Sequence, residues 1–182
     1  MIIYIADRYG KVLTTCSSEL PRNSTLLKDN LTDDLQSGVR VFECTLMATD
    51  KIREHAVTGN YVMAYNAPYT IISSTYDTTD NTISLYCEDA GLDFINKTVG
   101  TIALTSKTFQ QWIEWTLGTS ADNGWNYNFN IPNKSKSLEY TTEANAQERL
   151  LDILANYDAE MYFTYEIDGF KWIPRTINFV QK

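Results

Sequence analysis

Apolar and polar residues alternate along most of the first half of the chain, which is the pattern of strands with one buried face. The clearest case is the segment 82–88. Its predicted inward set is Ile83, Leu85 and Cys87. The apolar spacing then lengthens to three positions, from Leu92 to Ile95, which predicts a short helix directly after this strand.

Turn residues separate the other alternating segments at short intervals, which favours a barrel or a sandwich over a parallel sheet. Strands are predicted over 1–6, 11–15, 26–31, 39–47, 61–65, 69–76 and 82–87, and a short helix over 51–57. Segment 39–47 allows two inward faces. The face with Phe42, Cys44 and Leu46 buries more apolar surface than its alternative, so we prefer it and place Arg40 at the rim.

In the second half of the chain, apolar residues recur at the spacing of helices. One helix is predicted to begin at the cap Ser106 and to end at Gly118, and a longer one follows the cap Thr142. Their apolar faces carry Phe109, Trp112, Ile113 and Thr116 in the first helix, and Ala146, Leu150, Ile153, Leu154 and Tyr157 in the second. Segment 125–131 predicts a strand with an aromatic face.

A hairpin is predicted at the end of the chain, where strands 161–167 and 170–180 flank the turn residues Asp168 and Gly169. Together these patterns predict a β-rich α+β protein. We expect a β-barrel over residues 1–95, followed by an α+β domain with two helices and a C-terminal hairpin over residues 96–182.

Composition excludes several classes of protein. The 182 residues have 43% hydrophobic and 21% charged residues, a globular balance. The formal charge is −8 and the basic residues are scattered, so we expect no sequence-specific nucleic-acid binding. The apolar runs are too short for a membrane span, and residues 1–10 do not read as a signal peptide.

Few residues suggest chemistry. His55 is the single histidine and no nucleophile motif lies near it, so we interpret it as a surface residue. The three cysteines, Cys16, Cys44 and Cys87, are widely spaced in apolar strand segments, which predicts buried free thiols and assembly in a reducing cytoplasm. We expect no metal and no cofactor.

Two acidic clusters allow a functional and a structural interpretation. Glu88, Asp89 and Asp93 could form an acid and base pair, as in a cell-wall endopeptidase, or could bind a hard cation. Acids at the start of a helix also complement its dipole, and we favour that interpretation. The loop with Asp77, Asp80 and Asn81 could suggest calcium, but turn chemistry explains it better.

Aromatic residues are abundant: 12 Tyr, 7 Phe and 4 Trp. Four tyrosines lie close together in the sequence, and we predict that they form an interface with another subunit. These candidate interface residues are Tyr61, Tyr65, Tyr69 and Tyr76. The alternative is a carbohydrate-binding module that uses exposed Trp125, Tyr127 or Trp172.

Several segments in this order resemble the N-terminal region of phage minor structural proteins, the family of tail-associated lysins, baseplate hubs and prophage endopeptidase tails. The segments are IADRYGKVLTT from Ile5, LTDDLQSGVRVFECTL from Leu31, GNYVM from Gly59, TISLYCEDAGLDFIN from Thr82 and ERLLDILANYDAEMYFTYEIDGFKW from Glu148. They cover nearly the whole chain, and none is a catalytic signature.

The resemblance implies a structural role in the virion. Members of this family look like trimeric hubs at the tip of the tail tube, with hub-type β-barrels, and they contact the distal tail protein and the tape-measure protein. Some carry a C-terminal hydrolase, of which no segment is visible in these 182 residues, so we expect no enzymatic activity. Family hubs usually continue into a second barrel, and we therefore expect this chain to be a fragment of a longer protein.

Overall fold

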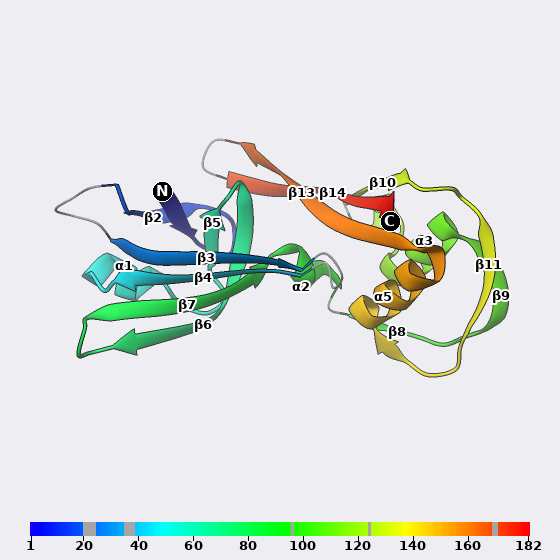
Figure 1. The fold of residues 1–182 in the computed structure, drawn as a ribbon, viewed down its shortest axis with the longest axis horizontal. Coiled ribbons are helices and arrows are strands. Elements are labelled where there is room, and N and C mark those ends of the chain that lie inside the picture. The colour runs from blue at the N-terminus through cyan, green and yellow to red at the C-terminus, as the bar shows by residue number, and fades with distance from the viewer. Residues whose placement is uncertain (20–24, 35–38, 96, 124, 169–170) are drawn as a thin grey trace. The chain divides into compact units, whose positions relative to one another are not determined.

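The computed structural model describes residues 1–19, 25–34, 39–95, 97–123, 125–168 and 171–182 (Figure 1). Its contacts divide the chain into two compact units. The first unit comprises Met1–Asp34, Val39–Ala90 and Tyr165–Ile173, and the second comprises Gly91–Thr164 and Pro174–Lys182. The expected domains 1–95 and 96–182 stay a prediction.

The first unit is built on a seven-stranded sheet in the order β2-β1-β5-β6-β7-β4-β3. Its strands are β1 Ile2–Ala6, β2 Val12–Ser17, β3 Leu26–Asp34, β4 Val39–Met47, β5 Tyr61–Ala64, β6 Ala67–Asp77 and β7 Thr82–Asp89. All the neighbouring strands pair antiparallel. The helix α1 spans Asp50–His55, and the side chain of Thr49 caps it by accepting from the amide of Ile52.

The core of this unit confirms the predicted strand faces. Phe42 and Leu46 of β4 are 0% exposed, and Ile83, Leu85 and Cys87 of β7 are buried with them. The sheet buries one face because every second side chain of a strand points to the same side. The ring of Tyr69 lies 5.4 Å from that of Phe42 in this core.

The β-rich α+β class is confirmed, whereas a closed barrel is not observed in the described residues. No ladder there joins the edge strands β2 and β3. One short link approaches closure, since the amide of Thr25, next to β3, donates to the carbonyl of Ser17 at the end of β2, at 2.9 Å. Barrel closure therefore stays a prediction.

The second unit combines helices with small sheets. Its elements are α2 Gly91–Ile95, β8 Thr98–Val99, β9 Ile102–Thr108, α3 Phe109–Leu117, α4 Ser120–Asn123, β10 Asn126–Asn130, β11 Ser135–Tyr140, β12 Ala144–Asn145 and α5 Ala146–Tyr157. The strands β13 Ala159–Asp168 and β14 Lys171–Gln181 have residues in both units. The sheets have the orders β10-β14-β13, β11-β9 and β12-β8.

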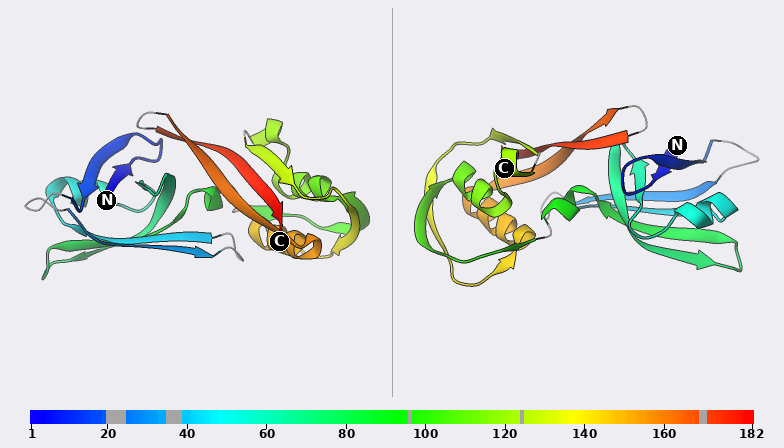
Figure 2. Two further views of the ribbon diagram at one scale, coloured as in Figure 1. Left: turned by 45° about the horizontal axis from the view of Figure 1, so that its top comes forward. Right: turned by 180° about the vertical axis from the view of Figure 1, so that it is seen from behind.

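The predicted short helix α2, the two longer helices α3 and α5, and the strands β13 and β14 are all present. The predicted turn at Gly169 lies outside the described residues. Figure 2 shows α3 and α5 from two further directions. Their apolar faces meet aromatic partners, because Phe109 of α3 makes edge contacts with the rings of Tyr157 and Phe179.

Both predicted helix caps are wrong by a few residues. Ser106 lies inside β9, and α3 is capped by Thr108, whose side chain accepts from the amide of Gln111 in a capping box. The cap of α5 is Asn145, not Thr142. In each case strand pairing holds the predicted residue or its neighbours outside the helix, so the last available polar residue caps it.

The three thiols are free and buried in the first unit, as predicted. Burial raises the pKa of Cys16 to about 11 and that of Cys87 to about 12, from 9.0. Burial, with the neighbouring thiols Cys87 and Cys16 as smaller contributions, also raises the pKa of Cys44. The folded state therefore keeps protons that the unfolded chain loses above pH 9.

We predict that the contribution of these buried thiols to the free energy of unfolding is fully present below pH 9. This contribution is lost as the pH rises from 10 to 12. Between pH 8 and pH 10 each thiol should lower the free energy of unfolding by about 1 kcal/mol. Urea unfolding at both pH values measures this loss, and Cys87→Ala should show a loss smaller by about that amount. Equal losses in the variant and the wild type would contradict this explanation.

Gly91 begins α2 in close contact with an aromatic ring. A Cβ atom at this position would lie 2.7 Å from ring atoms of Phe163, which is too close for real atoms. We predict that Gly91→Ala lowers the free energy of unfolding by about 1 to 3 kcal/mol. Gly100→Ala is the matched control, because nothing lies within 4 Å of its added Cβ, and it should stay within about 0.5 kcal/mol of wild type. Equal stabilities of the two variants would refute the steric account.

Candidate functional site

Glu88 and Asp89, two of the three acids that suggested catalysis, are not brought together. Glu88 and Asp89 are consecutive residues of β7, so their side chains point to opposite faces of the sheet. Glu88 is half-buried on the outer face and accepts from the hydroxyl of Tyr86 at 3.2 Å. The side chain of Asp93 lies outside the described residues. This geometry gives no support to an acid and base pair.

Asp89 has a structural role instead. It is 2% exposed, and its Oδ1 accepts a hydrogen bond from the hydroxyl of Tyr165, which packs against the core of the first unit. A buried carboxylate needs such donors, because its desolvation is otherwise unfavourable. No signal in the sequence linked these two residues, which are 76 positions apart.

The other polar candidates also have local partners. The side chain of Asp77 accepts from the amides of Thr79 and Asp80, at 2.8 and 3.4 Å, which is ordinary turn chemistry. His55 lies near Glu54, with 3.9 Å between Nε2 and Oε2. In the part of the chain that the structure describes, no group of histidine, cysteine or acidic residues could hold a metal ion.

The four candidate interface tyrosines do not share one face. Tyr69 is 1% exposed and belongs to the core, where burial, and after it the charge of Asp89, raises its pKa to about 12. A residue in that place is not available to a neighbouring subunit. Tyr61, at the start of β5, is half-buried.

Tyr65 and Tyr76 are half-exposed and hydrogen-bonded. Tyr65 is in the two-residue turn between β5 and β6, with φ +50, and donates to Asp29 at 2.7 Å. This bond raises the pKa of its hydroxyl. Tyr76 lies on the outer half of β6 and donates to Asn81 at 3.0 Å. Contact of Tyr61, Tyr65 or Tyr76 with another subunit stays a prediction.

Two of the three aromatic residues proposed for sugar binding have partners within the chain. Trp125 is 6% exposed and packs edge-on against Phe163. Tyr127 is half-buried and donates to the carbonyl of Gly118 at 2.9 Å. The side chain of Trp172 lies outside the described residues.

None of the helices in the described ranges is long and apolar enough to cross a membrane.

The fold is similar to those of two solved tail proteins and of a component of a secretion system. The prophage tail protein gp18 of Listeria monocytogenes matches 99% of this chain with a TM-score of 0.68 at 13% identity. The tail protein of Neisseria meningitidis matches 97% with a TM-score of 0.59 at 10% identity. An E. coli component of the type VI secretion system, itself structurally similar to the T4 tail proteins gp27 and gp5, matches 85% with a TM-score of 0.50 at 10% identity.

No family model matches the chain, and no curated protein matches it by sequence. The chain covers 50%, 50% and 47% of the three solved chains, so it spans about half the length of each. At these identities the likeness is one of fold. This β-rich α+β chain therefore has a fold that occurs in prophage tail proteins.

We predict that the bond from Tyr165 to Asp89 stabilises the first unit. Tyr165→Phe and Asp89→Asn should each lower the free energy of unfolding by about 1 to 3 kcal/mol, since each removes one partner of a buried pair. The double variant should lose less than the sum, with a coupling of at least about 0.5 kcal/mol in urea unfolding. Tyr162→Phe is the matched control, because Tyr162 is 38% exposed. Strict additivity would contradict the pairing.

Proposed function

We propose that this chain is a structural module of the tail tip of a phage or prophage, in the baseplate hub that closes the tail tube. The observation that carries the proposal is the fold shared with the Listeria prophage tail protein along 99% of the chain. The hub position draws support from the E. coli protein, whose own likeness is to the T4 tail proteins gp27 and gp5. The order of the sequence segments that resemble hub proteins agrees with both.

The edge strands of the seven-stranded sheet support a role in assembly. The strands β2 and β3 are at the edges of the seven-stranded sheet, and an edge strand presents backbone groups that another chain can pair with. In our proposal several copies, three in the hub, complete a closed arrangement by using such edges or the tyrosines Tyr61, Tyr65 and Tyr76. Heterologous contacts close into a ring when the rotation between neighbouring copies closes, as it does for a three-fold axis.

The proposal places the protein in the virion, at the tail tip, after assembly in the cytoplasm of the host bacterium. Its partners are further copies, the distal tail protein and the tape-measure protein. It acts by shape and contact and catalyses no reaction. The separation of Glu88 and Asp89 onto opposite faces of β7 supports the last point, because these two acids cannot act together as the pair that an endopeptidase needs.

Light scattering coupled to size-exclusion chromatography tests the assembly. The native gene product, with whatever precedes or follows these residues, should form a species of three copies whose mass is constant over a wide range of concentrations. The tape-measure protein and the distal tail protein, added separately, should each shift that peak. A product that stays monomeric at high concentration would contradict the hub proposal.

A further inference from the structure

The outer half of β6 has an open edge. Residues 67–70 of β6 pair with β5 on one side, and residues 69–71 pair with β7 on the other. Residues 73–77 pair with β7, and no ladder in the described residues covers their other side. Every residue from Ile72 to Asp77 is exposed. A short edge strand therefore exists within the sheet, on the side of β6 that β5 leaves uncovered.

Hydrogen-bond directions along β6 identify the groups that are open. Ile71 bonds away from β7, because its amide donates to Asn60 at 2.8 Å and its carbonyl accepts from Gly59 at 3.0 Å. Ile71 lies opposite Cys87, so these two residues form a pair without backbone hydrogen bonds between them. Such pairs alternate along an antiparallel ladder, so every second residue of β7 counted from Cys87 also makes no backbone hydrogen bond to β6. The register shift after Ile71 then places Ser74 and Tyr76 opposite such residues. Their backbone amides and carbonyls therefore point to the open edge.

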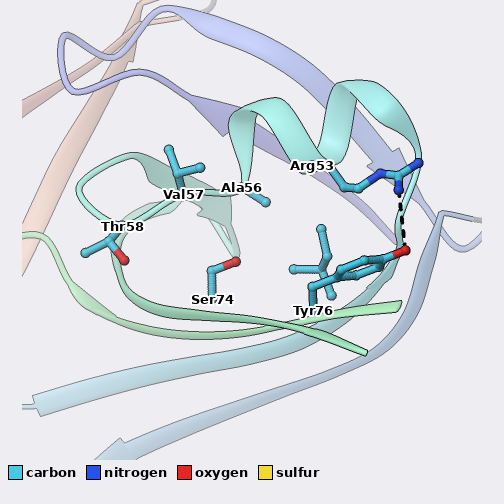
Figure 3. A pocket seen from close by; sticks show the side chains of 7 residues that line it. Arg53, Ala56, Val57, Thr58, Ser74 and Tyr76 are labelled. Carbon is cyan, nitrogen blue, oxygen red and sulfur yellow. Dashed lines mark hydrogen bonds between the residues drawn. The ribbon is translucent and has the colours of Figure 1, made fainter. Parts of the chain in front are cut away.

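A groove runs beside this edge. Its volume is about 400 Å³, and it lies between α1 with its following loop and the β6–β7 ribbon (Figure 3). Its lining residues are Arg53, Ala56, Val57, Thr58, Ser74, Tyr76 and Ile83. Two of the exposed apolar side chains, Val57 and Tyr76, which are 43% and 42% exposed, line this groove.

We propose that the open edge of β6 and this groove form a docking site for an extended, acidic peptide segment of a partner protein. Such a segment would add as a strand to β6, with its backbone paired to Ser74 and Tyr76. Every second side chain would then enter the groove, under Ala56 and Val57, where small apolar side chains fit. The remaining side chains would stay in solvent.

Charge complementarity identifies the segment as acidic. Arg53 is the one charged residue among those that line the groove. Its guanidinium lies 5.5 Å from the centre of the Tyr76 ring and bonds Asp50 at 2.8 Å. The side chain of Asp50 is 99% exposed, so this pair is weak and a carboxylate in the groove can join or replace it. The site does not depend on the hub proposal.

A synthetic peptide tests the site directly. The probe is a fluorescein-labelled peptide of seven residues in which threonine alternates with valine. One groove-facing residue near an end is replaced by glutamate. Two versions are made, one with the glutamate near the N-terminus and one with it near the C-terminus. Fluorescence anisotropy with this chain should give saturable binding for at least one of the two. A matched peptide with lysine in place of glutamate should bind at least about tenfold more weakly, a difference of about 1.4 kcal/mol.

Two variants separate backbone pairing from charge. Ser74→Pro removes an amide that points away from β7 and should weaken binding at least about tenfold, whereas Ser74→Ala keeps that amide and should bind as wild type. Arg53→Glu should reverse the preference between the glutamate and lysine peptides. This second variant keeps the proposal testable if Ser74→Pro does not fold, which circular dichroism detects.

Three results would overturn the proposal. The first is that neither acidic peptide binds. The second is that folded Ser74→Pro binds as wild type and Arg53→Glu leaves the peptide preference unchanged. The third is that the chain self-associates in sedimentation velocity, that Ser74→Pro abolishes this association, and that the peptide does not compete with it. A second copy of the chain would then occupy the edge.

Discussion

The first unit depends on one constraint: a single sheet must bury one face in a core while all its interior backbone groups stay paired. Phe42 and Tyr69, from β4 and β6, meet at the centre of that core. Their burial fixes the register of the strands, because a shift by one residue would move both rings to the opposite face. The thiols and the buried Asp89 take their properties from the same core.

The same constraint leaves strand edges uncovered, and these are where we expect the protein to act. Within the described residues β2 and β3 end the sheet, and β5 is too short to cover the outer half of β6. Natural sheets usually protect such edges. A chain that keeps them open is suited to contact with other chains, which agrees with the tail-tip role proposed from the fold.

The sequence predicted those parts of the fold that depend on local periodicity, such as the inward set of β7 and the apolar faces of α3 and α5. It failed where long-range pairing decides. Ser106 was expected to cap a helix but lies in β9, which pairs with β11. The four tyrosines are neighbours in sequence, yet strand alternation puts Tyr69 in the core. No periodic signal could reveal that Tyr165 would satisfy Asp89.

Amide hydrogen exchange by NMR on the isolated chain tests the open sheet most directly. The account predicts fast exchange at Ser74 and Tyr76, whose amides point to the uncovered edge, and slow exchange at Ser73 and Thr75, whose amides point to β7. Slow exchange at all four positions would mean that the edge is covered. That result would contradict the claim that this protein presents an unpaired strand for assembly.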